Sequence, residues 1–393
     1  MRKTLLAAAS ILALSATAQA EVKMGVILGF TGPIESLTPD MAAGAEIAMK
    51  EASDSGKFLD GETVTAVRAD STCIDAAAAS AAAERLITSD GVVSLMGPDC
   101  SGVTTAVANN VAIPNGVLLI SPSATSPALS TIDDNGLFFR TAPSDARQGE
   151  VLADVAMEQG IKSIAITYTN NDYGKGLSDA FKAAFEAIGG EVTISVPHED
   201  GKGDYSADVG ALASAGGDAL AVLGYVDQGG RGIMQAAIDT GAFDTFALGD
   251  GMIGDSLLDL PGLDAAKVFG TAAGSESDAA GKYAEMAAAA GVTGSGPYQG
   301  ESYDAAALMI LAIQKAGSAD RGALAGNIMD IANAPGEQIG PGELGKALEL
   351  VAAGTDIDYQ GATGVEFTDV GEALGSYKEL AIEDGAWKTV AVR

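Results

Sequence analysis

Residues 97–102 form the first of three short segments whose side chains could do chemistry. They read Gly-Pro-Asp-Cys-Ser-Gly and precede a stretch of helical composition that begins at Val103. Free backbone N–H groups at the start of such a helix, together with the Ser101 hydroxyl, can bind a carboxylate without any Lys or Arg. Ser101 is equally suited to cap the helix, so the segment alone leaves both interpretations open.

Residues 121–127 form the second segment and read Ser-Pro-Ser-Ala-Thr-Ser-Pro. The two prolines favour an extended turn, which would point the Ser123 carbonyl, the Thr125 hydroxyl and nearby N–H groups outward. Ala124 lies between them and is counted with the candidate site. A helix N-cap is the alternative interpretation.

The third segment places Asp250 between two glycines, just after an expected strand at residues 245–248. A single acid there can accept an ammonium group, because an ammonium buried in a closed cleft needs such a partner. Ordinary turns also contain Asp and Gly, so that alternative remains. Tyr173 and Tyr225 follow two other strands, and each offers an aromatic wall and a hydroxyl.

The composition excludes several classes of protein. The 393 residues contain 22 Lys and Arg against 53 Asp and Glu, and the resulting formal charge of −31 repels nucleic acid. One histidine cannot build a multi-histidine metal site, and histidine-dependent catalysis would rest on His198 alone. We therefore expect no catalytic residue, no metal site and no cofactor.

An exported hydrolase is the enzyme alternative, because Gly-Asp-Ser-Leu at residues 254–257 imitates the opening of a lipase-like enzyme. Ser256 and His198 would then act together. The chain lacks the Asp-x-x-His pattern that would support this hypothesis. We expect His198 itself in a solvated loop.

The first twenty residues have the pattern of a signal peptide. Arg2 and Lys3 precede an apolar run at residues 5–14, and an Ala-Gln-Ala sequence ends at Ala20. The run is too short to span a bilayer, and no Cys follows the expected cleavage point to carry a lipid anchor. We therefore expect a periplasmic protein that is cleaved after Ala20 and has no stable membrane anchor.

Export determines how the two cysteines are interpreted. Cys73 and Cys100 are the only cysteines in the sequence, and pairs in an oxidising compartment are usually bridged. We predict a disulfide between them. Two buried thiols are the alternative.

Short apolar runs alternate with Ala-rich helical stretches, a pattern that favours parallel sheets. The expected strands are at residues 22–28, 63–69, 92–96, 117–121, 162–168, 191–196, 219–224, 245–248, 267–271, 364–367, 376–382 and 386–392. The expected helices are at residues 40–52, 75–87, 103–111, 148–159, 177–188, 205–214, 232–240, 278–290, 302–316 and 323–331.

The alternation starts again after Arg140, which indicates an α/β fold with two doubly wound parallel-sheet lobes joined by a three-strand hinge. We expect the N-terminal lobe to comprise residues 21–142 and 272–362, and the C-terminal lobe residues 143–271 and 363–393. Ligands bind beyond the carboxyl ends of the strands in such sheets. The three segments should therefore meet in the cleft between the lobes.

Several motifs recur together in one known group of proteins. They are Asp-Ser-Thr-Cys at residues 70–73, Cys-Ser-Gly at 100–102, Leu-Ile-Ser-Pro-Ser-Ala-Thr-Ser-Pro at 119–127, Asp-Tyr-Gly-Lys-Gly at 172–176, Asp-Tyr-Ser-Ala at 204–207 and Gly-Tyr at 224–225. In these the chain resembles the Leu/Ile/Val-binding proteins, the type I periplasmic receptors of branched-chain amino acid ABC importers. The resemblance covers essentially the whole chain after the signal peptide.

The resemblance implies roles for the first-lobe residues. Ser101 would bind the ligand carboxylate through its hydroxyl and N–H. Thr125 would give its N–H to the carboxylate and its hydroxyl to the ammonium, and Ser123 would offer a carbonyl oxygen to the ammonium.

The resemblance also implies roles for the second-lobe residues. Tyr225 matches the second-lobe tyrosine of the site, and Tyr173 matches an aromatic wall. Asp250 stands where the family usually has a Glu that contacts the α-ammonium, so the shorter acid is a departure. Residues 36–37, Ser-Leu, are another departure, because many relatives carry an aromatic lining residue there. Both bear on side-chain selectivity.

The function implied by the resemblance is that of a substrate-binding component of an ABC importer. It would be a monomer that captures a neutral, branched-chain amino acid between its lobes and delivers it to the permease subunits. An amide, a urea or an aromatic acid is the alternative ligand for the same receptor role.

Overall fold

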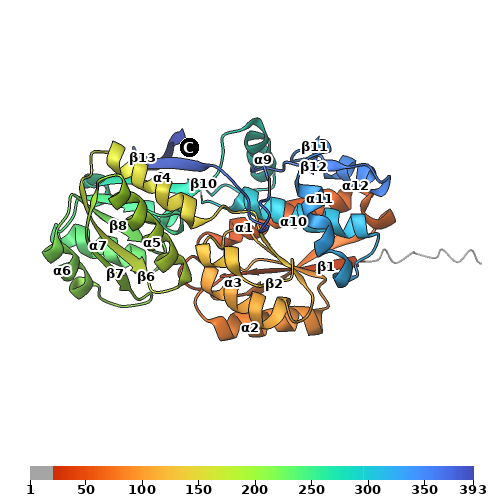
Figure 1. The fold of residues 1–393 in the computed structure, drawn as a ribbon, viewed down its shortest axis with the longest axis horizontal. Helices are drawn as coiled ribbons and strands as arrows, with labels where there is room; N and C mark the ends of the chain where they lie inside the picture. Colours follow the sequence, from red (N-terminus) through yellow and green to blue (C-terminus); the bar gives the residue numbers. More distant parts are fainter. Residues whose placement is uncertain (1–20, 295) are drawn as a thin grey trace, which may run out of the picture.

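Two β-sheets organise the chain, one in each lobe (Figure 1). The computed structural model describes residues 21–294 and 296–393, and the expected signal peptide lies outside the described residues. The first sheet has the order β2-β1-β3-β4-β5, and all its strand pairs are parallel. Its strands are β1 (Glu21–Leu28), β2 (Thr63–Asp70), β3 (Ser94–Met96), β4 (Leu118–Ser121) and β5 (Phe138–Arg140).

The second sheet has the order β14-β13-β10-β9-β8-β6-β7. Its strands are β6 (Ser163–Thr169), β7 (Glu191–His198), β8 (Ala219–Leu223), β9 (Thr245–Leu248), β10 (Lys267–Ala273), β13 (Tyr377–Glu383) and β14 (Ala386–Val392). Strands β6 to β10 pair in parallel, whereas β13 and β14 add an antiparallel edge. A short parallel pair, β11 (Glu337–Ile339) and β12 (Ile357–Tyr359), lies outside both sheets.

Helices cover both faces of the sheets, as expected for crossover connections between parallel strands. They are α1 (Thr38–Ser55), α2 (Ala76–Arg85), α3 (Ser101–Val107), α4 (Asp145–Glu158), α5 (Asp172–Ala187), α6 (Ser206–Ala215), α7 (Gly229–Thr240), α8 (Asp255–Leu258), α9 (Asp278–Ala289), α10 (Gln299–Ala316), α11 (Ile328–Ala332) and α12 (Leu344–Ala352). In the first lobe α1 packs on α10 and α2 packs on α3, with the sheet between the two pairs (Figure 1).

The α/β fold with parallel sheets was predicted correctly, and most strands lie within a residue or two of their expected positions. Strands β5, β11 and β12 were missed, because three residues are too few to show an alternating pattern. The expected strand at 364–367 is wrong. Only Phe367 forms a bridge there, to Ala373 in the same segment.

The chain crosses between the sheets three times, and the crossings lie side by side. Tyr377 Oη donates to the Ser144 carbonyl at 3.0 Å, and Gly274 N donates to the Ser376 carbonyl at 2.9 Å. Residues 272 and 273 still belong to β10, and the backbone of Arg140 in β5 bonds to residues 371 and 373. We therefore propose that the chain passes from one lobe to the other near residues 142, 274 and 375. The third of these boundaries lies later in the chain than the expected boundary at residues 362–363.

No helix among the described residues is both long enough and apolar enough to cross a membrane.

The predicted disulfide joins Cys73 to Cys100, with a Cα–Cα distance of 5.2 Å. It links the loop after β2 to the residue that immediately precedes α3. The bridge therefore restrains the position of Ser101, the first residue of that helix.

We predict that Cys73→Ser combined with Cys100→Ser lowers the free energy of unfolding of the mature chain by about 3 to 4 kcal/mol. The physical reason is the entropy of the unfolded loop, which the bridge restricts over a separation of 27 residues. Urea denaturation monitored by circular dichroism measures the change. Reductant should lower the wild-type midpoint and leave the double variant unchanged; identical midpoints for the two oxidised proteins would contradict the prediction.

Candidate functional site

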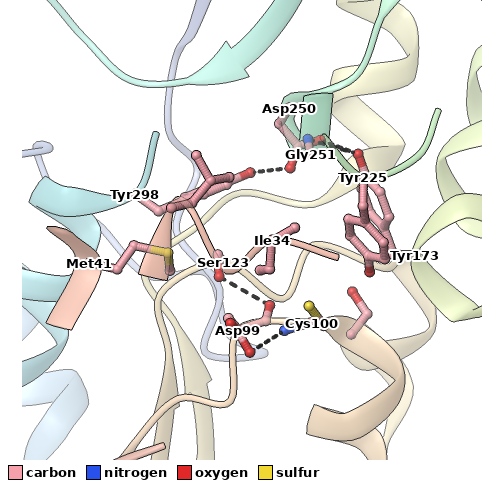
Figure 2. A pocket seen from close by; sticks show the side chains of 12 residues that line it. Ile34, Met41, Asp99, Cys100, Ser123, Tyr173, Tyr225, Asp250, Gly251 and Tyr298 are labelled. Carbon is pink, nitrogen blue, oxygen red and sulfur yellow. Dashed lines mark hydrogen bonds between the residues drawn. The ribbon is translucent and has the colours of Figure 1, made fainter. Parts of the chain in front are cut away.

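A cavity of about 30 Å³ lies between the lobes, at the carboxyl ends of both sheets (Figure 2). Most of the lining residues follow strands of the two sheets, as expected for doubly wound folds, whereas Tyr298 directly precedes α10. They are Ile34, Leu37, Met41, Asp99, Cys100, Ser101, Ser123, Tyr173, Tyr225, Asp250, Gly251 and Tyr298. Five of the seven residues expected from the sequence are among them.

Ser101 and Ser123 supply the uncharged polar wall of the first lobe. The Ser101 oxygen accepts a hydrogen bond from Ser126 N at 3.1 Å, which leaves the hydroxyl proton available to an acceptor in the cavity. The Ser123 hydroxyl donates to the Asp99 carbonyl at 3.1 Å. Ser123 therefore holds its own loop in place with its side chain.

Asp99 is a cavity residue that sequence reasoning missed. Its carboxylate accepts hydrogen bonds from Gly29 N at 2.8 Å, Ser71 Oγ at 3.1 Å and Cys100 N at 3.0 Å. These bonds tie together the loops that follow β1, β2 and β3. Burial raises the pKa of the Asp99 carboxyl, and the hydrogen bonds oppose part of that rise. Asp99 thus shapes the first-lobe wall.

Arg140 holds the loop that contains Ser123, Ala124 and Thr125. Its side chain is 1% exposed and donates to the carbonyls of Ala124 at 3.0 Å and Ser126 at 2.9 Å. The guanidinium also pairs with Glu372 at 2.5 Å, which ties the loop to the third crossing.

Ala124 and Thr125 differ from the expectation, because both are buried behind the cavity wall. The Ala124 carbonyl is occupied by Arg140, and its N–H donates to Ser121 Oγ at 3.0 Å. The Thr125 carbonyl accepts from Asp145 N at 2.8 Å. Neither residue is among those that line the cavity in this conformation.

Tyr173 and Tyr225 form the aromatic wall of the second lobe. Their rings stack with centroids 5.2 Å apart and an interplanar angle of 18°. Tyr173 is in the first turn of α5, a helix capped by Asn171, whose Oδ1 accepts from Gly174 N at 3.0 Å. The same Asn171 donates to Tyr225 Oη at 3.3 Å, so one side chain positions both tyrosines.

Asp250 is held between two phenols. Tyr173 donates to its Oδ1 at 2.9 Å, and Tyr298 donates to its Oδ2 at 2.6 Å. Burial raises the pKa of the Asp250 carboxyl above its usual value, and the Tyr298 and Tyr173 hydroxyls lower it in part. The two phenols fix the plane of the carboxylate, whose remaining lone pairs stay available.

Tyr298 is the second cavity residue missed from the sequence. It immediately precedes α10, and its backbone is left-handed, with a φ of 72°. Its carbonyl accepts from Ser302 N at 3.0 Å and from Ser302 Oγ at 2.7 Å. Tyr298 belongs to the expected first lobe, so its hydrogen bond to Asp250 joins the two lobes directly.

A second buried acid, Asp145, lies close to Asp250 at the start of α4. Burial, followed by the charge of Asp250, raises the pKa of the Asp145 carboxyl well above its usual value, while the Thr125 hydroxyl and Arg140 lower it. Two neighbouring buried carboxyls favour a cation at this end of the cavity.

The lobes are closed on each other. Ser36 N donates to Asp227 Oδ2 at 2.8 Å, and Asp227 N donates to the Pro33 carbonyl at 3.0 Å. Thr105 Oγ1 donates to Asp172 Oδ2 at 3.3 Å on another side of the cleft. The cavity is therefore bounded by residues from both lobes.

His198 does not lie in a solvated loop, contrary to the expectation. It is 1% exposed at the end of β7, and its Nδ1 lies 2.9 Å from Thr167 Oγ1. Burial lowers the pKa of its imidazole to about 4. Ser256 donates to Asp227 Oδ1 at 2.7 Å, so each member of the alternative hydrolase pair is bonded to a different residue.

The cavity combines serine hydroxyls and the hydrogen-bonded Asp99 on one lobe, Asp250 on the other and aromatic and aliphatic walls between them. No Lys or Arg is among the lining residues within the described ranges. Such a site suits a small molecule that carries both an anionic and a cationic group. Fold and site together define a two-lobed, ligand-binding receptor of the periplasmic type.

Comparisons with known proteins identify the family. The family model described as "Periplasmic binding protein" matches residues 21–356. The Leu/Ile/Val-binding protein homolog 3 of Brucella melitensis is 31% identical over 320 residues, which cover 79% of this chain and 84% of that protein. The chain therefore belongs to the periplasmic binding proteins and, within them, to the Leu/Ile/Val-binding proteins.

Solved structures agree on the fold. A leucine-binding protein from Thermotoga maritima has a TM-score of 0.78 at 25% identity and covers 94% of this chain and 98% of its own. A solute-binding protein of an ABC transporter from R. palustris, in complex with benzoate, has a TM-score of 0.77 at 16% identity, over 95% of this chain and 96% of its own. Proteins with this fold therefore bind ligands with and without an ammonium group.

We predict that Arg140→Met lowers the free energy of unfolding by about 3 kcal/mol, because it removes the ion pair with Glu372 and the hydrogen bonds to the carbonyls of Ala124 and Ser126. Urea denaturation of the mature chain tests this. Arg147→Met, which removes an exposed ion pair with Glu150, is the matched control and should change stability by less than about 0.5 kcal/mol. Equal effects of the two substitutions would show that Arg140 does not anchor the loop.

Proposed function

We propose that the chain is the periplasmic substrate-binding component of an ABC importer and that it binds a neutral α-amino acid between its lobes. One observation carries the proposal: Ser101 and Ser123 face the cavity from one lobe, and Asp250 faces it from the other. Ser101 supplies donors for a carboxylate, Ser123 offers its carbonyl oxygen to the ammonium, and Asp250 supplies the charged partner for that ammonium. Membership of the Leu/Ile/Val-binding proteins supports the same conclusion.

The energetics fit a reversible receptor. Hydrogen bonds to charged groups contribute about 1.5 to 3 kcal/mol each. A few of them, reduced by the ordering of ligand and lobes, give about −8 kcal/mol, which corresponds to a micromolar dissociation constant. The ligand favours closure only by as much as it binds the closed form better than the open form. Contacts with both lobes therefore make the closed form a signal of loading.

An aromatic acid is the alternative ligand, because the structurally similar protein from R. palustris was solved with benzoate. Such a ligand has no ammonium group and would place no cation beside Asp250. A buried carboxylate near a second one, Asp145, favours a ligand that brings a positive charge. Asp250 therefore favours the amino acid over the aromatic acid.

We also propose the features of export and assembly that the resemblance implies. The mature chain begins after cleavage at Ala20, acts as a monomer without a membrane anchor and delivers its ligand to permease subunits. Ser101, Ser123, Tyr173, Tyr225 and Asp250 contact the ligand directly. Thr125 acts from behind the wall, through the position of its loop.

We predict that Asp250→Asn weakens binding of L-valine by about 10- to 100-fold, because it replaces a charge-assisted hydrogen bond with a neutral one. Binding of 3-methylbutanoate, the same molecule without the amino group, should change less than about threefold. Isothermal titration calorimetry of both ligands measures the difference.

The control for that experiment is Glu301→Gln, which replaces the carboxyl group of a buried acid outside the cavity. It should leave both affinities unchanged. Equal losses of valine and 3-methylbutanoate in Asp250→Asn would show that Asp250 does not face the ammonium. Binding of benzoate but of no amino acid would overturn the proposed function.

We predict that the affinity for the amino acid falls as the pH is lowered through the pKa of Asp250. Burial raises this pKa, so the protonated and neutral form appears at a higher pH than for an exposed Asp. Since only the ionised form attracts the ammonium, the loss starts at a higher pH than it would for an exposed Asp. Titrations between pH 8 and pH 4 test this; Asp250→Asn should give a flatter profile, and parallel profiles would contradict the assignment.

A further inference from the structure

The part of the cavity that faces Tyr298 has walls that are apolar and confined. Ile34, Leu37 and Met41 follow β1, and the Tyr298 ring lies beside Met41 (Figure 2). The stacked tyrosines stand on the opposite side of the cavity. If the serines and Asp250 hold the ligand's charged groups, this apolar part remains for its side chain.

Two of these walls are fixed in position. Tyr298 is held at its hydroxyl by Asp250 at 2.6 Å and at its carbonyl by Ser302. Leu37 is enclosed by glycine backbones, because a Cβ atom on either Gly254 or Gly296 would lie 2.9 Å from Leu37 Cδ2. Moving Tyr298 back would break its hydrogen bond to Asp250 in the other lobe.

Met41 is the adaptable wall. Met41 is 1% exposed on α1, and its unbranched side chain has more rotamers than a branched one. Met41 and Tyr298 line the same side of the cavity (Figure 2). Met41 therefore sets how far the side-chain compartment extends.

The size of the cavity limits the ligand. In this conformation the cavity measures about 30 Å³. Every carbon atom that a ligand adds must displace a wall of a closely packed interior. A larger side chain therefore opposes closure more than a small one.

We propose that the cleft prefers neutral amino acids with the smallest side chains, with alanine above valine and valine above leucine, and that Met41 and Tyr298 set this limit. The proposal rests on the proposed function and ranks ligands within it. One methylene in an apolar pocket discriminates by about 10- to 200-fold. Alanine should therefore bind at least about tenfold tighter than leucine.

The test is calorimetric titration of the mature chain with glycine, alanine, valine and leucine. Met41→Ala should raise the affinity for leucine at least about tenfold relative to alanine, because it lengthens the compartment. The matched control is Met49→Ala, which truncates another buried methionine of α1 that does not line the cavity. It should leave the alanine-to-leucine ratio unchanged.

The outcomes are distinguishable. Wild-type protein that binds leucine as tightly as alanine would overturn the size limit and leave the proposed function intact. An unchanged ratio in Met41→Ala, or an equal change in Met49→Ala, would overturn the assignment to Met41. If no amino acid binds and benzoate does, the proposed function fails and the ranking fails with it.

Discussion

The carboxylate of Asp250 is the group on which the arrangement of the two lobes depends. A buried charge is tolerated only when polar partners surround it, and here the partners come from both lobes. Tyr173 belongs to the same lobe as Asp250, whereas Tyr298 reaches across the cleft. Any opening of the cleft separates Tyr298 from Asp250 and exposes the carboxylate to water. Asp250 therefore links the two lobes, and in the proposed function it also binds the ammonium group of the ligand.

The residues around this contact hold the loops of the first lobe in fixed positions relative to one another. Asp99 joins three loops of the first lobe through its carboxylate, and Arg140 joins the fourth to the hinge through Glu372. Both side chains are buried, so water does not compete for their hydrogen bonds. Strain on the hinge is thus transmitted directly to the residues that face the ligand. The cavity wall and the hinge form one connected hydrogen-bonded unit.

The fold was largely predictable because strand and helix periodicities are local, and the three candidate segments did meet at the cleft. Asp99 and Tyr298 were missed for different reasons. Asp99 lies within a segment that was examined, yet its importance comes from partners in two other loops. Tyr298 follows no strand and adopts a left-handed backbone at the start of α10, which no pattern in its neighbourhood indicates. His198 was misplaced because the flanking Pro and acidic residues indicate a loop, whereas β7 continues through Pro197 and ends at His198.

The two departures from the family pattern, Asp250 and Leu37, both lie at the cavity. Asp in place of Glu moves the acid one methylene away from the first lobe, and the Tyr298 hydroxyl crosses the cleft to meet it at 2.6 Å. Leu37 takes the position where many relatives carry an aromatic residue, and it fits between two glycines that admit no side chain. A long ligand would have to break the Tyr298 contact or displace Leu37. In the proposed site the limit on the ligand's side chain therefore comes from the positions of Tyr298 and Leu37.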